Sequence, residues 1–165
     1  MDVSAYMSAP AVSVTATTTI GEAARCMDLH GVGCVVVTDG EVLRGIVTDR
    51  DIAVRAVAGG FDRDAPVGAV MTTPAVTVGA AEDVHAAYRT FRTSGVRRLP
   101  VLDGQRVVGM LTVDDLLMDV FRRVADLLGP VAWSVLEEPP GPRDEIGARA
   151  PAGTDGKSPP ASRGS

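Results

Sequence analysis

The sequence has few residues of the kinds that mark membrane insertion or disulfide cross-linking. Aromatic residues make up 4% of its 165 residues, and there are two histidines and two cysteines. No run of 18 apolar residues is present, so no segment is predicted to span a membrane. Two cysteines are too few for a disulfide scaffold, and the first residues lack the basic and apolar regions of a signal peptide. We therefore expect a cytoplasmic protein.

The charged and catalytic residue types argue against two further functions. The net charge of −5 is unfavourable for broad binding to duplex nucleic acid. Binding of single strands through Arg97, Arg98 and the pair Arg122-Arg123 is a weaker alternative, because aromatic residues for base stacking are scarce. The sequence has no P-loop, no dinucleotide-binding motif and no recognisable nucleophile–base arrangement, so we expect no enzymatic activity.

Two cysteines and a histidine, all potential metal ligands, lie at intervals of four residues. Cys26 and His30 are four residues apart on one face of a predicted helix, and Cys34 lies on the strand that follows. A fourth ligand is not evident, and the spacing matches no standard zinc pattern. Buried cysteines are common in apolar cores, so we predict no metal site.

The chain contains an internal repeat with a period of 64 residues. Residues 3–53 align with residues 67–117 without a gap, and 18 of these 51 positions are identical. Such a repeat indicates one folding unit used twice. A unit of about 60 residues is marginally stable by itself. We therefore expect the two units to pack sheet to sheet around a pseudo-twofold axis, with two equivalent clefts.

Hydrophobic periodicity predicts the same elements in both units: a short strand, a helix, two strands joined by an Asp-Gly turn, and a second helix. In the first unit we expect Thr19 to cap the first helix and Gly31 to end it. Thr48 is expected to cap the second helix, which Gly59-Gly60 ends. In the first unit we expect strands at residues 12–14, 33–38 and 42–47 and the first helix at 20–30. In the second unit we expect strands at 75–78, 96–102 and 106–111 and the first helix at 82–94.

A longer apolar helix is expected from Thr112, with apolar residues at helical spacing up to Leu128. This stripe either packs under its own sheet or forms a homodimer interface. Gly129-Pro130 is expected to end the helix, and the composition from Glu137 onward predicts a disordered tail. The expected divisions are two units at 1–60 and 61–128, a short apolar extension at 129–136 and the tail at 137–165.

The second helix of each unit begins with Thr-x-x-Asp, at Thr48–Asp51 and at Thr112–Asp115. A threonine at the N-cap and an acid three residues later form a capping box, which explains the motif structurally. A functional explanation also fits. The carboxylate can accept hydrogen bonds from a ribose diol, while the threonine hydroxyl and helix N–H groups bind phosphate oxygens. The spacing alone does not choose between them.

A larger set of motifs recurs in the same order in both units: Met-[ST]-x-Pro, a Gly-Val entry to a strand, an Asp-Gly hairpin, and Gly-h-h-Thr-x-x-Asp-h, where h is apolar. This duplicated set resembles the CBS domain, whose tandem pairs form the Bateman module, over roughly residues 1–128. The chain looks like the small stand-alone bacterial members. The resemblance implies a mixed α+β (α/β) fold of two β-α-β-β-α units, usually in a dimer of modules. It also implies binding of AMP, ADP, ATP or S-adenosylmethionine between the units.

The resemblance implies roles for particular residues. Asp51 and Asp115 hold ribose, and Thr48 and Thr112 assist at ribose or phosphate. The other implied binding residues border the adenine ring or supply apolar contact: Val12, Ser13, Val76, Thr77, Leu99, Pro100 and Met110. To these we add Arg97, Arg98 and Arg50, whose positive charge suits an anionic ligand.

The two clefts are expected to be equivalent in position but not in ligand binding, because their charges differ. The second unit has Arg97-Arg98 where the first has Gly33-Cys34. Two guanidiniums suit an anionic ligand, a solvated strand end or a salt bridge in a dimer. Arg50 lies inside the first Thr-x-x-Asp, whereas the second has Asp114, which would repel phosphate.

Together these observations predict a regulatory module that needs no cofactor. It would sense an adenosine compound and signal to an unidentified effector protein. The alternative is a dimeric interaction protein whose clefts are vestigial and whose Thr-x-x-Asp boxes only cap helices.

Overall fold

The computed structural model describes residues 1–137, with side chains up to Pro130. Residues Met1–Asp126 form one compact unit, and a second unit begins at Leu127. The predicted tail lies outside the described residues except for Glu137, the last residue of a helix. The side chains of the predicted apolar extension from residue 131 onward also lie outside them.

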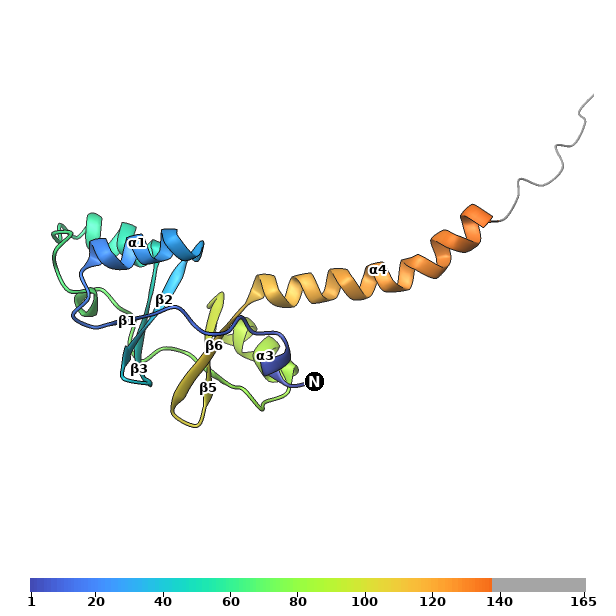
Figure 1. Ribbon diagram of the computed structural model, residues 1–165, viewed down its shortest axis with the longest axis horizontal. Coiled ribbons are helices and arrows are strands. Elements are labelled where there is room, and N and C mark those ends of the chain that lie inside the picture. Colours follow the sequence, from blue (N-terminus) through green and yellow to red (C-terminus); the bar gives the residue numbers. More distant parts are fainter. Residues whose placement is uncertain (138–165) are drawn as a thin grey trace, which may run out of the picture. The chain divides into compact units, whose positions relative to one another are not determined.

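Both repeats contain the predicted order of elements (Figure 1). Repeat 1 comprises β1 (Ser13–Thr15), α1 (Ile20–His30), β2 (Cys34–Asp39), β3 (Val42–Thr48) and α2 (Asp49–Asp51), which continues as a π-helical segment over Ile52–Val57. Repeat 2 comprises β4 (Val78–Gly79), α3 (Val84–Ser94), β5 (Arg98–Asp103), β6 (Arg106–Thr112) and α4 (Val113–Glu137). Each repeat begins with a short 3₁₀ turn, at Val3–Ala5 and Val67–Ala69. The predicted mixed fold is confirmed.

Helix α1 begins and ends where its local sequence predicts. The Thr19 hydroxyl accepts a hydrogen bond from the Glu22 N–H at 3.2 Å, and the Glu22 carboxylate accepts one from the Thr19 N–H at 3.0 Å. This capping box satisfies two backbone donors. Gly31 ends the helix with a φ of 62°, a conformation that costs glycine little. The helix buries the side chains of Ile20, Ala23 and Met27.

The strands lie in the order β1-β2-β3-β6-β5-β4. In each half, the first strand is parallel to the second and the second is antiparallel to the third. Figure 1 shows α1 with the first half and α3 with the second. The two halves pair only at Val42 of β3 and Arg106 of β6. They therefore form two lobes of Met1–Asp126, which we call the first and second lobes after the repeat that supplies their strands.

Each lobe completes its core with the first residues of the other repeat. Val3 is fully buried in the second lobe, and Val67 is fully buried in the first. Ser8 exchanges two backbone hydrogen bonds of 2.9 Å with Met110 of β6. Thr72 exchanges the equivalent two backbone hydrogen bonds with Ile46 of β3, at 2.9 and 3.1 Å. The N-terminus accordingly lies beside α3 (Figure 1), and each repeat contributes residues to both lobes.

These exchanged segments explain the glycine that opens each Gly-h-h-Thr-x-x-Asp motif. A Cβ atom on Gly109 would lie 2.8 Å from the Ser8 carbonyl oxygen and 2.5 Å from the Met7 sulfur. A Cβ atom on Gly45 would lie 2.7 Å from the Thr72 carbonyl oxygen. Only a residue without a side chain allows the exchanged backbone to approach this closely.

Two predicted element boundaries in repeat 2 are wrong. Strand β4 covers only Val78–Gly79 instead of 75–78, because Thr72 already pairs with β3 and Pro74 has no N–H to donate. Helix α3 begins at Val84 rather than Glu82, because the Asp83 side chain accepts a hydrogen bond from the His85 N–H at 2.9 Å and acts as the N-cap.

The break predicted at Gly129-Pro130 is also wrong, since α4 continues through both residues to Glu137. Proline inside a helix removes the hydrogen bond to the carbonyl four residues earlier, which belongs to Asp126. Asp126 is exposed, so water can bind this carbonyl and the helix can continue.

Candidate ligand-binding cleft

Both Thr-x-x-Asp motifs form complete capping boxes. Oδ2 of Asp51 accepts hydrogen bonds of 2.9 Å from both the Thr48 N–H and the Thr48 hydroxyl, and the Asp51 N–H donates to that hydroxyl at 3.0 Å. At Thr112 and Asp115 the corresponding distances are 2.8, 2.7 and 3.1 Å. The capping interpretation is therefore confirmed at both motifs, and the ribose role stays a prediction.

The second carboxylate oxygen distinguishes the two motifs. Oδ1 of Asp51 lies 3.4 Å from Nε of Arg55, four residues further along the helix. The residue of repeat 2 equivalent to Arg55 is Asp119, which cannot pair with Asp115 and instead pairs with Arg123 at 2.7 Å. No described residue forms a hydrogen bond or ion pair with Oδ1 of Asp115. Asp115 therefore has an acceptor available to a ligand, whereas Asp51 shares its acceptor with Arg55.

A cavity of about 300 Å³ lies next to Asp115 and is lined by both repeats. Five of the predicted binding residues line it: Val12, Arg98, Met110, Thr112 and Asp115. The remaining lining residues are Ser8, Pro10, Ala11, Gly31, Val32, Gly33, Cys34 and Asp114. We call this cavity the Asp115 cleft.

The sequence prediction missed Pro10, Ala11 and Gly33. Pro10 and Ala11 lie just after Ser8, which pairs with Met110 of the other repeat, and this pairing brings them to the cleft. A signal for them existed, because Pro10 and Ala11 recur as Pro74 and Ala75 in the repeat alignment. Gly33 carried no such signal, since its repeat equivalent is an arginine.

The other predicted binding residues do not line the Asp115 cleft. Leu99 and Pro100 are fully buried in the second lobe, and Arg50 and Arg97 are exposed. Thr48 and Asp51 hold the equivalent position in the first lobe. The roles predicted for these residues and for Ser13, Val76 and Thr77 stay predictions.

The walls of the Asp115 cleft combine apolar side chains with the polar side chains of Ser8, Arg98, Thr112, Asp114 and Asp115. Val12, Pro10 and Met110 offer side chains against which a flat ring can pack. Cys34 is buried, and burial raises the pKa of its thiol to about 11, although the nearby Arg98 guanidinium lowers it and the Asp49 carboxylate raises it. The thiol is therefore neutral at pH 7. An apolar cavity with a few convergent polar groups is the usual form of a small-molecule site.

The structure also places the residues considered for metal and nucleic-acid binding. The Cys26 sulfur lies 3.7 Å from Nδ1 of His30, and this nitrogen is 2.9 Å from the Cys26 carbonyl oxygen. Within residues 1–137 no group of three or more histidine, cysteine or acidic side chains is arranged to hold a metal ion. Of the arginines considered for single-stranded nucleic acid, Arg98 lines the cleft and Arg123 donates to the Tyr6 hydroxyl at 2.7 Å.

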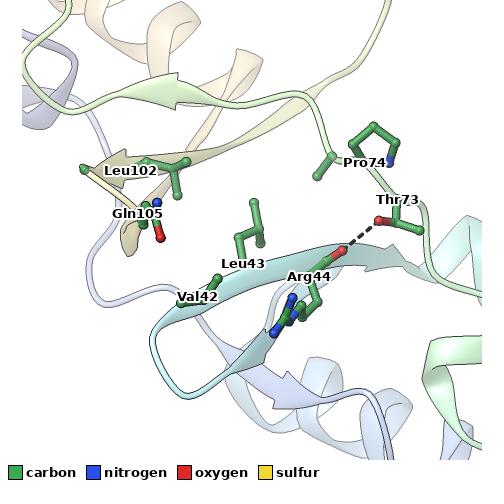
Figure 2. Close-up of a pocket in the computed structure, with 9 residues that line it drawn as sticks. Val42, Leu43, Arg44, Thr73, Pro74, Leu102 and Gln105 are labelled. Carbon is green, nitrogen blue, oxygen red and sulfur yellow. Dashed lines mark hydrogen bonds between the residues drawn. The ribbon is translucent and has the colours of Figure 1, made fainter.

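A second cavity of about 430 Å³ lies between β3 and the β5–β6 hairpin (Figure 2). Figure 2 shows Leu43 pointing into this space and the Thr73 hydroxyl donating to the Arg44 carbonyl oxygen, at 2.8 Å. Arg44 is the one charged residue among those that line it, and its guanidinium pairs with Asp39 at 2.7 Å. Because this charge is already paired, the Asp115 cleft is the better candidate for a charged ligand.

The repeated motifs, the exchanged segments and the cleft lined by both repeats together define a module built from two copies of one domain. Residues 3–57 and residues 67–122 each match the CBS domain. The chain belongs to the CBS domain family and contains two copies of the domain. No helix in the described part of the chain has both the length and the apolar character needed to cross a membrane.

Proteins similar to this chain are themselves CBS proteins. The CBS domain-containing protein YhcV of Bacillus subtilis is 36% identical over 113 residues, which are 68% of this chain and 81% of YhcV. Other curated relatives are longer, and the matched part is 53% of one from Methanopyrus kandleri and 21% of one from Arabidopsis thaliana.

Two solved structures similar to this chain contain adenosine compounds. A CBS domain protein from Pyrobaculum aerophilum complexed with AMP is 32% identical with a TM-score of 0.66, over 70% of this chain and 90% of that chain. The CBS domain pair of the protein MJ0100, in complex with 5′-methylthioadenosine and S-adenosylmethionine, is 26% identical with a TM-score of 0.68. The match covers 74% of this chain and 98% of that chain.

Proposed function

We propose that this protein is a regulatory module that binds an adenosine compound in the Asp115 cleft and signals its presence to a partner protein. The observation that carries the proposal is that Asp115 lines a cavity of about 300 Å³ and its Oδ1 has no partner among the described residues. Ribose presents two adjacent hydroxyls, and an ionised carboxylate is a strong acceptor for such donors. Related CBS structures hold AMP, or S-adenosylmethionine and methylthioadenosine, which supports this class of ligand.

Binding at this position has a direct route to regulation. The cleft is lined by Val12 and Gly33 of repeat 1 and by Met110 and Asp115 of repeat 2. A ligand there contacts both lobes, whose strands pair only at Val42 and Arg106. It will favour the arrangement of the lobes that it fits best, and a partner that distinguishes these arrangements can respond. We propose that the protein acts in the cytoplasm by binding its ligand, without catalysing a reaction.

Calorimetric titration of the purified chain tests the proposal. The panel is adenosine, AMP, ADP, ATP and S-adenosylmethionine, with guanosine as the control for base recognition. We expect at least one adenosine compound to bind below millimolar concentration, and guanosine to bind more weakly. A bound ligand at 100 times its Kd also raises the unfolding free energy by about 2.7 kcal/mol. If no adenosine compound binds, the vestigial-cleft alternative is correct.

The proposal includes a homodimer formed through the second helices of both repeats. Met118 and Phe121 of α4 are 52% and 58% exposed. Their repeat equivalents Val54 and Val57 are 55% and 73% exposed. Apolar residues exposed at matching positions of both repeats suit an interface with a second copy, because such interfaces use one patch on both subunits.

Light scattering after size exclusion tests the homodimer. We expect the natural chain to have twice the monomer mass, and Phe121→Glu to shift it to a monomer. Leu29→Glu is the matched control, because Leu29 is 82% exposed on α1 and lies outside the second helices of the repeats. A monomeric natural chain, or a dimer that Phe121→Glu leaves intact, contradicts this part of the proposal.

A further inference from the structure

The Asp115 cleft is lined by three charged side chains that have no ionic partner in the described part of the chain. They are Arg98, Asp114 and Asp115. Water solvates these charges while the cleft is open, but a ligand that displaces this water must replace the lost interactions. A ligand of this cavity is therefore expected to carry charged groups of both signs in addition to a ribose and a base.

The position of Arg98 depends on the glycine that faces it. A Cβ atom on Gly33 would lie 2.5 Å from a terminal nitrogen of Arg98 and 3.0 Å from a carboxylate oxygen of Asp49. The guanidinium from β5 of repeat 2 thus occupies the place where residue 33 of repeat 1 would carry a side chain. Asp49 approaches the same side of Gly33 as Arg98 without forming an ion pair with it, so the field of Asp49 offsets part of the positive charge of Arg98.

The balance of charge in this cleft is unfavourable for a phosphate chain. Two carboxylates, on Asp114 and Asp115, share the cavity with one guanidinium. The repeat partner of Asp114 is Arg50, and the repeat partner of Gly33 is Arg97. Arg50 and Arg97, which suit phosphate, therefore correspond to the Asp51 side of the module. At the Asp115 cleft an acid, Asp114, replaces the first and a glycine, Gly33, replaces the second.

We propose that the ligand of the Asp115 cleft is an adenosine compound whose 5′ substituent is an amino acid rather than a phosphate chain. Its carboxylate pairs with Arg98, its ammonium pairs with Asp114, and its ribose hydroxyls bind Asp115. S-adenosylmethionine and S-adenosylhomocysteine have this chemistry. The inference rests on the proposed function, since it names the ligand class for the same cleft.

Titration with five probes separates the ligand classes. S-adenosylmethionine and S-adenosylhomocysteine carry the amino acid, methylthioadenosine lacks it, and AMP and ATP carry phosphate. A hydrogen bond to a charged group contributes about 1.5–3 kcal/mol, so we expect the amino-acid compounds to bind at least about tenfold more tightly than methylthioadenosine. We expect AMP and ATP to bind more weakly than methylthioadenosine, because Asp114 repels them.

Variants test the assigned pairs. Asp114→Asn and Arg98→Gln are each expected to weaken S-adenosylhomocysteine about tenfold or more and to leave methylthioadenosine within about twofold. Gly33→Ala adds a methyl group where the Arg98 guanidinium lies and should reproduce the Arg98→Gln effect without changing charge. Arg25→Gln and Asp28→Asn, on the exposed face of α1, are the matched charge controls and should change neither affinity.

The outcomes distinguish this inference from the proposed function. If AMP or ATP binds more tightly than S-adenosylhomocysteine, the amino-acid assignment is overturned, while the adenosine-binding module stands. The assignment is also overturned if Asp114→Asn and Arg98→Gln affect methylthioadenosine and S-adenosylhomocysteine equally. If none of the five compounds binds, the proposed function itself fails.

Discussion

The repeat supplies a matched pair of substitutions that separates helix capping from ligand binding. Asp51→Ala and Asp115→Ala each remove a carboxylate that accepts two hydrogen bonds from its capping threonine. The two carboxylates differ in their second oxygen, which in Asp51 lies 3.4 Å from Arg55 and in Asp115 has no described partner. The pair therefore has nearly the same structural effect and a different predicted effect on binding.

The stability of the two variants is expected to fall by similar amounts. Each substitution leaves the N-cap threonine in place and removes the acidic half of the capping box, which costs about 1 kcal/mol. Asp51→Ala also loses its pair with Arg55, whose side chain is 48% exposed. A solvent-screened pair at this spacing adds only about 0.3–0.5 kcal/mol. We expect unfolding free energies about 1 kcal/mol below the natural chain in both variants, with Asp51→Ala slightly the lower of the two.

The affinities are expected to differ much more than the stabilities. A ribose diol can donate two hydrogen bonds to Asp115, each contributing about 1.5–3 kcal/mol when the acceptor is charged. Removing the carboxylate should weaken an adenosine ligand by about 100-fold if both bonds form, and by at least about tenfold if one does. Asp51→Ala should leave the affinity at the Asp115 cleft within about twofold, since Asp51 does not line it.

Urea denaturation of both variants without ligand measures the first expectation, and calorimetry with the ligand that binds the natural chain most tightly measures the second. Both titrations are made at a temperature where each variant is folded by circular dichroism. Equal losses of affinity in Asp51→Ala and Asp115→Ala would refute the conclusion that the ligand binds at Asp115 because the Oδ1 of this residue has no protein partner. An Asp115→Ala variant with natural affinity and reduced stability would leave only the capping role.

Two further predictions concern the exchanged segments and the buried thiol. Gly109→Ala should lower the unfolding free energy by about 1–3 kcal/mol, because its Cβ would lie 2.8 Å from the Ser8 carbonyl oxygen. Gly129→Ala, a helical position with no heavy atom within 4 Å of the added Cβ, should instead be neutral or stabilising in the same urea denaturation. The natural chain should lose stability between pH 9 and 11, because burial raises the pKa of Cys34 from 9.0 to about 11 and only the unfolded thiol ionises in that window. Denaturation across this range should show a smaller loss for Cys34→Ala, and an equal loss in both proteins would contradict the assignment to Cys34.

Several features of this protein were determined by short stretches of sequence. The bounds of α1, the two capping boxes and the Asp-Gly turns all depend on residues within about four positions of one another. The ungapped repeat extended these local predictions to the order of elements in both halves and to membership in the CBS family. Capping and periodicity act through the nearby backbone, so they can be recognised without knowledge of the tertiary fold.

Other features were decided by contacts between residues that are far apart in the chain. Ser8 pairs with Met110, and this exchange brings Pro10 and Ala11 to the cleft and requires glycine at position 109. The Gly129-Pro130 pair has the local sequence of a helix end, yet α4 continues past it.

The candidate site belongs to both categories. Thr112 and Asp115 were predicted as a pair from the sequence, but the same pattern predicted Thr48 and Asp51 equally well. Only the tertiary structure distinguishes them, because it places Arg55 against Asp51 and leaves Oδ1 of Asp115 available beside a cavity lined by both repeats. A local motif determines how a helix begins, whereas the free acceptor and the opposing guanidinium of Arg98 depend on how the two lobes meet.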